Sequence, residues 1–111
     1  MDKTISLNQN TLFRRLYYRG KKIACPTLAI YFMRNSLNSN RLGITVSGKI
    51  GNAVVRNRIR RQIREVYRLL ECSLKSGFDI VIVARHAIID APYSIIERDI
   101  HWVFNKGSLC R

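Results

Sequence analysis

Residues 51–68 read GNAVVRNRIRRQIREVYR, and this stretch combines the pattern of a core helix with a dense run of positive charge. Its apolar side chains recur every three or four residues, and the spacing continues just beyond the stretch. This period predicts a helix from about residue 53 to 72 with one buried face. Asn52 is suited to cap its N-terminus. The expected buried face consists of Val55, Ile59, Ile63, Val66 and Leu70.

The remaining sides of this helix carry six arginines and a single acid, Glu65. The arginines are Arg56, Arg58, Arg60, Arg61, Arg64 and Arg68. Solvated helix faces mix charges of both signs, whereas arginines without acidic partners repel one another. Arginine also has a planar guanidinium that binds phosphate through two hydrogen bonds and stacks on bases. The helix therefore predicts a nucleic-acid-binding surface.

Two further helices are indicated by periodicity and by end signals. Residues 8–19 place apolar side chains on one face, with Asn8 or Asn10 as the capping residue and Gly20 as the stop. A last helix is expected at about residues 93–105, where the pattern is amphipathic.

Three strands are indicated by composition. Residues 27–34 and 41–47 are rich in β-branched and apolar side chains, and we expect them to pair with each other. Residues 78–85 are apolar almost throughout, which is typical of a strand buried on both faces. The alternation of helices and strands predicts a sheet with helices packed on it. We expect a single domain over residues 1–111.

The charge of the chain is high and unevenly distributed. The formal net charge is +13 over 111 residues, and 47% of the residues are apolar, which excludes a disordered basic tail. The whole excess lies in residues 1–75, because residues 76–111 contain four basic and four acidic side chains. Three widely spaced cysteines favour reduced thiols in a cytoplasmic protein. No segment has the pattern of a signal peptide or of a membrane span.

Aromatic side chains accompany the charge and favour RNA over DNA as the partner. Phe13, Tyr17 and Tyr31 are the strongest candidates for stacking on unpaired bases, with packing in the core as the alternative for each. A helix that reads the DNA major groove usually belongs to a small helical domain, whereas this one stands between strands.

No group of residues predicts a protein active site or a metal site. The carboxylates and histidines of the C-terminal third are scattered outside the basic part of the chain. They are Asp79, Asp90, Glu97, Asp99, His86 and His101. A metal-dependent nuclease needs clustered carboxylates, and acid–base cleavage needs a paired acid and base. We therefore expect no catalytic and no metal-binding side chains, which disfavours an autonomous protein nuclease.

The stretch KIGNAVVRNRIRRQIR, residues 49–64, resembles the signature of the bacterial ribonuclease P protein family, with Arg56-Asn57-Arg58 at its centre. FRRLYYRG at 13–20, LGITVS at 42–47 and DIVIVAR at 79–85 resemble the family's N-terminal helix and strands in the same order. The resemblance spans about residues 7–108. Gly48 departs from it, because the family often has a second lysine there, and one cation is missing from the turn.

This resemblance implies an α/β (α+β) two-layer sandwich, in which a four-stranded, mainly antiparallel sheet packs against three helices. The arginine-rich helix would lie in a left-handed β-α-β crossover, against the usual hand. The implied function is that of a protein subunit of the endoribonuclease that removes the 5′ leader from precursor tRNA. A catalytic RNA, with Mg²⁺ bound mainly by that RNA, would carry out the chemistry. The expected partners are ribonuclease P RNA and precursor tRNA, without DNA or a membrane.

The resemblance also implies two sets of contact residues. The set that it implies for the catalytic RNA is Lys49, Asn52, Arg56, Asn57, Arg58, Arg61 and Arg64. The charge of the helix adds Arg60 and Arg68 to this expected set. The set expected to line a cleft for the leader is Phe13, Tyr17 and Tyr31. A structural RNA-binding protein of the ribosomal type, without a role in cleavage, is the alternative that composition allows, and a DNA-binding module is a third.

Overall fold

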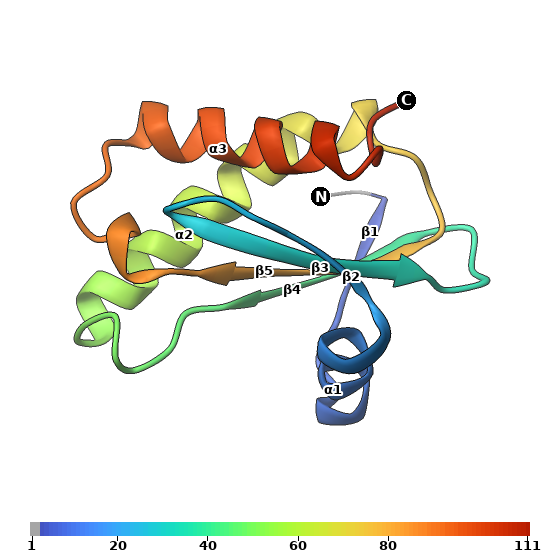
Figure 1. Ribbon diagram of the computed structural model, residues 1–111, viewed down its shortest axis with the longest axis horizontal. Helices are drawn as coiled ribbons and strands as arrows, with labels where there is room; N and C mark the ends of the chain where they lie inside the picture. The colour runs from blue at the N-terminus through green and yellow to red at the C-terminus, as the bar shows by residue number, and fades with distance from the viewer. Residues whose placement is uncertain (1–2) are drawn as a thin grey trace.

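The computed structural model describes residues 3–111, in which two helices cover one face of a sheet and a third lies on the other face (Figure 1). The elements in chain order are β1 (Thr4–Ser6), α1 (Asn10–Arg19), β2 (Lys21–Ala24), β3 (Leu28–Arg34), β4 (Asn40–Thr45), α2 (Ala53–Leu70), β5 (Phe78–Ala84) and α3 (Tyr93–Lys106). Short 3-10 turns lie at Glu71–Ser73 and His86–Ile88. No helix within residues 3–111 is both long enough and apolar enough to cross a membrane.

The sheet differs from the expected four-stranded, mainly antiparallel one. Five strands are described, in the order β1-β4-β5-β3-β2. The β1–β4 and β4–β5 pairs are parallel, whereas β2–β3 and β3–β5 are antiparallel, so the sheet is mixed. The strands that sequence reasoning missed are β1 and β2, which have only three and four residues. Segments this short do not show the alternation that marks a strand.

The expected pairing of the strands at 27–34 and 41–47 is wrong, because β5 lies between β3 and β4. The composition of β5 explains its central place. Ile80 and Ile82 pack into the core under α2 and α3, while Val81 packs under α1. A strand that is apolar on both faces is stable only where both faces are covered.

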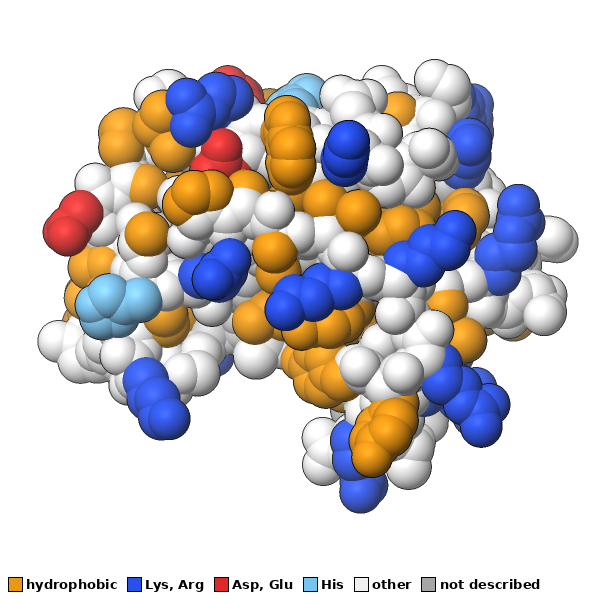
Figure 2. Space-filling model, in the orientation of Figure 1, with side chains coloured by type: hydrophobic (Ala, Val, Ile, Leu, Met, Phe, Trp, Pro, Cys, Tyr) orange, Lys and Arg blue, Asp and Glu red, His pale blue; other side chains and the backbone are white. Residues whose placement is uncertain are grey.

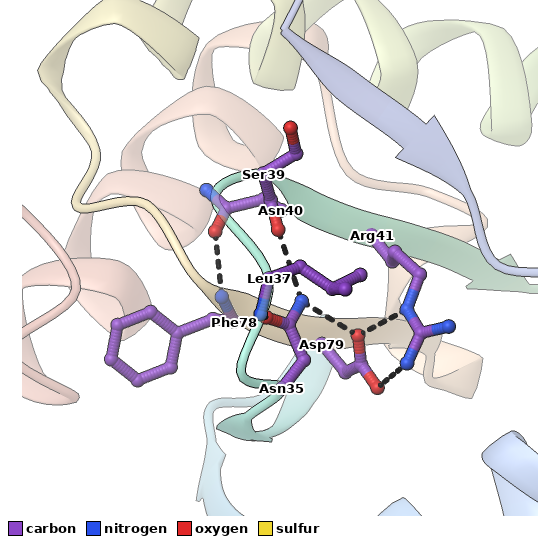
Figure 3. Close-up of polar contacts among 7 residues, drawn as sticks. All are labelled: Asn35, Leu37, Ser39, Asn40, Arg41, Phe78 and Asp79. Atoms are coloured by element: carbon purple, nitrogen blue, oxygen red, sulfur yellow. Dashed lines mark hydrogen bonds and ion pairs between the residues drawn. The ribbon is translucent and has the colours of Figure 1, made fainter.

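A polar network at the beginning of β5 holds its two neighbours in register (Figure 3). The Asn40 side chain accepts from the Phe78 N–H at 2.8 Å and donates to the Lys75 carbonyl at 2.8 Å. Asp79 accepts from Arg41 at 2.7 and 2.8 Å and from the Asn35 amide at 3.0 Å. Hydrogen bonding to Asp79 raises the pKa of Arg41. The buried carboxylate thus joins β4, β5 and the end of β3.

The arginine-rich helix forms as predicted. Asn52 caps it, because its side-chain oxygen accepts from the Val55 N–H at 3.0 Å. The helix ends at Leu70 and continues as the 3-10 turn, slightly earlier than expected. Its stripe is buried at four of the five expected positions, and Val55 is half-buried. Tyr67, which the stripe did not include, is also buried and meets Phe104 of α3 edge to face at 6.1 Å.

Helix α1 lies alone on the opposite face of the sheet (Figure 1). Neither Asn8 nor Asn10 caps it: the N-cap is Gln9, and no side chain bonds the first turn. Gly20 ends the helix as predicted, with its N–H bonded to the Leu16 carbonyl at 2.9 Å. Leu16 is buried against the sheet, in a small cluster with Leu7 and Val81.

Candidate nucleic-acid interface

The guanidinium groups of α2 surround the half of the helix that the core leaves free. Arg58, Arg61, Arg64 and Arg68 are exposed. Arg56 and Arg60 are half-buried, because they flank the buried stripe on the side of Tyr67. The structure therefore presents the arginines of the predicted catalytic-RNA set on one continuous helix, at different depths.

Two of these arginines are held in place by carbonyl or amide oxygens. Arg60 donates to the Asn57 side chain at 3.1 Å and to the Val46 carbonyl, just after β4, at 3.4 Å. Arg58 donates to the Ile89 carbonyl, between β5 and α3, at 3.3 Å. Because these partners are uncharged, the contacts position both guanidinium groups without compensating their charge.

Arg68 is the exception, since it is paired with the one acid of the helix. Its Nη2 lies 2.7 Å from Glu65, and its Nε makes a second bond at 3.1 Å. The hydrogen bond from Arg68 lowers the pKa of Glu65. The pair is exposed and adds little stability. Within residues 3–111 no other arginine of α2 forms an ion pair, so Arg68 is the least available of the six for a phosphate.

The residues expected at the start of α2 are placed differently from one another. Lys49 is exposed in the turn before the helix, and its backbone N–H bonds the Ser47 hydroxyl at 3.1 Å. Asn52 is exposed as well, but its side-chain oxygen is used to cap the helix. The Lys49 ammonium is therefore free to contact a ligand, whereas the Asn52 side-chain oxygen is already used to cap α2.

A cavity of about 500 Å³ lies between α1 and the end of β4. Phe13 and Tyr17 line it together with Asn10, Arg14 and Thr45. The hydroxyls of Tyr17 and Thr45 lie 3.4 Å apart. The lining contains a cation, aromatic rings and neutral polar groups but no carboxylate. These groups match a polyanion with unpaired bases.

Tyr31 lies beside this cavity and joins it to the edge of the sheet. Its ring meets that of Tyr17 edge to face, with centroids 4.9 Å apart and planes at 84°. The Nζ of Lys22 lies 5.5 Å from the centre of the Tyr31 ring. The three aromatics predicted to line a cleft thus come together from α1 and β3, and Tyr17 is 42% exposed. Two other aromatics lie elsewhere: Phe32 is in the core, and Tyr18 points into solvent.

A second cavity, of about 270 Å³, lies between α1, β4 and the arginines of α2. Arg60 and Arg64 line one side of it, and Phe13 and Gly43 line the other. Phe13 therefore contributes to both cavities and stands where the aromatic surface meets the arginine helix.

Four residues of this region were missed by sequence reasoning: Asn10, Arg14, Lys22 and Thr45. The residue spacing contains a partial indication for Asn10 and Arg14. They are four residues apart, and Tyr17 follows three residues later, so all three lie on one face of a helix. Lys22 and Thr45 gave none, since their place depends on strands pairing around β3 and β5.

Acidic groups are sparse throughout this surface. Neither cavity has an Asp or Glu in its lining. In the part of the chain from residue 3 onwards, no three His, Cys, Asp or Glu side chains lie close enough together to hold a metal ion. From residue 3 onwards, this surface is therefore rich in positive charge and carries no carboxylate cluster suited to metal-dependent hydrolysis.

Comparison with known proteins agrees with this geometry. A family model of Ribonuclease P matches residues 1–107. The ribonuclease P protein component of Thermoanaerobacter sp. (strain X514) is 38% identical over 107 residues, covering 96% of this chain and 92% of that protein. The corresponding protein of Clostridium acetobutylicum is 44% identical over 105 residues, covering 93% and 88%.

Solved structures give the same result. The RNase P protein of Staphylococcus aureus superposes with a TM-score of 0.89 at 31% identity, covering 96% of this chain and 97% of that one. The RNase P protein of Thermotoga maritima superposes with a TM-score of 0.84 at 25% identity, covering 91% and 96%. The chain therefore belongs to the ribonuclease P family, as its protein component.

Proposed function

We propose that this protein binds a catalytic RNA through the arginines of α2 and the 5′ leader of precursor tRNA through the aromatic cavity beside α1. In this way it assists the Mg²⁺-dependent endonucleolytic removal of the leader, which leaves the mature tRNA 5′ end. The observation that carries the proposal is the position of Phe13, which lines both cavities. Because the two surfaces adjoin there, one small protein can hold two RNAs side by side.

The protein's part in this reaction is electrostatic. Two RNAs repel each other when they meet, and a protein of net charge +13 between them lowers that repulsion and the concentration of Mg²⁺ that the reaction needs. The Nε of Arg56 is buried without a hydrogen-bond partner within the described residues. Because this atom is closed to solvent, the Arg56 side chain would have to rotate outward for a phosphate oxygen to satisfy the donor.

The chemistry belongs to the RNA in this proposal. The catalytic RNA and the Mg²⁺ that it binds would supply the chemistry of phosphodiester hydrolysis. The protein residues orient the leader and screen its phosphates. We further propose that the crossover from β4 through α2 to β5 is left-handed. We also propose that the protein works in the cytoplasm, where its three free thiols stay reduced.

The test is cleavage of a leader-bearing precursor tRNA at low Mg²⁺ by the protein alone, by a bacterial ribonuclease P RNA alone, and by the two together. We expect cleavage at the mature 5′ end only in the mixture. Activity of the protein alone would place an active site in the chain and refute the proposal. Tight RNA binding without any gain over the RNA alone would instead favour the structural, ribosomal-type RNA-binding protein.

A further inference from the structure

A third cavity, of about 420 Å³, lies at the opposite end of β3 from the aromatic cavity and is not used by the proposed function. Four cations from separate segments surround it. They are Arg19 at the end of α1, Lys21 in β2, Arg34 at the end of β3, and Lys75 before β5. Segments far apart in the sequence thus bring positive charge to one place.

This charge is not balanced within the described residues. None of the four cations forms an ion pair or a side-chain hydrogen bond there, and no carboxylate lines the cavity. Figure 2 shows the same imbalance, because Lys and Arg side chains dominate the right half of this face while Asp and Glu appear only toward the left. Four like charges around one hollow favour an anionic ligand.

The wall of the cavity is apolar and aromatic. Phe32 and Phe78 form part of it, with ring centroids 6.3 Å apart. The Arg34 guanidinium lies 5.2 Å from the centre of the Phe78 ring. This stacking holds Arg34 over the cavity without neutralising it, so the cation is positioned before any ligand arrives.

Two simpler explanations account for only half of the cations. Lys21 lies on β2, an edge strand, where a lysine discourages pairing with another chain. Arg19 lies in the last turn of α1, where a cation interacts favourably with the helix dipole. Neither explanation applies to the other two cations, because Arg34 lies on the inner strand β3 and Lys75 lies in the segment before β5.

Strand β2 links this cavity to the aromatic surface. Lys22 is opposite Tyr31 and lies over its ring, whereas Lys21 is opposite Phe32 and lines the third cavity. Successive side chains of a strand point to opposite faces, so adjacent lysines serve the two surfaces in turn. A single RNA strand that leaves Tyr31 would meet Lys22 and then Lys21.

We propose that the third cavity binds phosphates of the distal part of the 5′ leader, upstream of the nucleotides held beside Tyr17 and Tyr31. The inference rests on the proposed function, because the near part of the leader must occupy the aromatic cavity. Contacts to phosphate position a strand without reading its bases. The third cavity therefore lengthens the bound segment of the leader without adding a sequence preference.

The test compares precursors with leaders of about 4 and about 16 nucleotides, the range of single-strand site sizes. Each is bound by the assembled holoenzyme containing the unaltered protein, the pair Arg34→Gln/Lys75→Gln, or the pair Arg15→Gln/Lys106→Gln. The last pair removes the same charge from exposed cations that do not line the third cavity.

We expect the unaltered protein and the control pair to bind the long leader more tightly than the short one. Arg34→Gln/Lys75→Gln should lose that difference and bind the short leader normally. For the long leader its log–log salt slope should fall by about 1.4, as two lost single-strand phosphate contacts require. Equal loss on both leaders, equal loss in both pairs, or weaker binding of the catalytic RNA alone would overturn the inference.

A second measurement does not depend on how the variants fold. A photoreactive group at the distal end of the long leader should crosslink the unaltered protein within β2, the end of β3 or the segment around Lys75. Crosslinks only elsewhere would overturn the inference. If the unaltered protein fails to stimulate cleavage of either precursor, the proposed function itself fails, which separates the two outcomes.

Discussion

The ring of Phe13 lies directly against Gly43 of β4, so closely that a Cβ at residue 43 would stand 2.6 Å from the Cζ of Phe13. No real side chain tolerates that approach. The missing side chain on β4 is therefore what lets Phe13 lie between the aromatic cavity and the arginine-lined cavity. The position of Gly43 has a direct consequence for the proposed leader site.

Gly43→Ala should displace the Phe13 ring and weaken leader binding. Overpacking should also lower the free energy of unfolding by about 1–3 kcal/mol, measured by chemical denaturation. Phe13→Leu removes the ring that the new methyl group would meet, so the double variant should lose less stability than the sum of the single variants. Strict additivity would show that the two residues do not press on each other.

Tyr31→Ala should weaken binding of a leader-bearing precursor by about 1–3 kcal/mol, the usual worth of one base stacked on an aromatic ring. The measurement is equilibrium binding to the holoenzyme with and without the leader. Tyr18→Ala is the control, because Tyr18 is also an α1 aromatic but is 92% exposed and lines neither proposed cavity. An equal loss on the leaderless substrate would point to misfolding.

Arg58→Ala should weaken binding of the catalytic RNA and reduce its log–log salt slope by about one, as expected for one phosphate contact. Arg58 is held only by the Ile89 carbonyl, so its removal leaves no unpaired acid behind. The slope is measured by titrating the RNA at several salt concentrations. An unchanged slope would mean that Arg58 does not touch phosphate.

Glu65→Gln should release Arg68, tighten binding of the catalytic RNA and steepen the salt slope by about one. Mild acid should not do the same. The hydrogen bond from Arg68 lowers the pKa of Glu65 below its ordinary value of 4.5. The ion pair is therefore fully formed at pH values above 4.5 and is lost only as the pH falls through the lowered pKa. Glu97→Gln makes the same change in net charge on α3. If it tightens binding equally, net charge and not Arg68 is responsible.

Asp79→Ala should lower the free energy of unfolding by about 3 kcal/mol, because the Arg41 guanidinium loses its acceptor and the Asn35 amide keeps only the Ser39 carbonyl. This value is at the lower end of the range for breaking a buried ion pair, because the Arg41 side chain is 25% exposed. Denaturant unfolding measures the change, with Asp90→Ala, at an exposed aspartate, as the control. If both variants unfold alike, the network of Figure 3 does not hold β5 in place.

Helix α2 was predicted accurately because its signals are local. The stripe from Ile59 to Leu70 repeats within a few turns, and Asn52 caps the residue three positions ahead. The arginines could be assigned to the free sides of the helix for the same reason. Only Tyr67 was overlooked, since a tyrosine on the flank of the stripe is compatible with either burial or exposure.

Strand pairing was predicted poorly because it is not a local property. Residues 27–34 and 41–47 both read as strands, and the chain between them is short enough for a hairpin. The insertion of β5 between β3 and β4, where Asp79 accepts a hydrogen bond from Arg41 of the adjacent β4, prevents that hairpin. β1 and β2 form strands because they pair with β4 and β3, and their own composition does not predict this.

The same division applies to the candidate site. Uncompensated arginines on a helix with one buried stripe are predictable without the fold, because helical period and charge are properties of nearby residues. Three arrangements emerge only in the fold: Tyr17 meets Tyr31, Phe13 lies against Gly43, and Lys21 lines the third cavity while Lys22 lies over the Tyr31 ring. These contacts depend on which strands become neighbours, and that choice is made by burying β5 on both faces at the centre of the sheet.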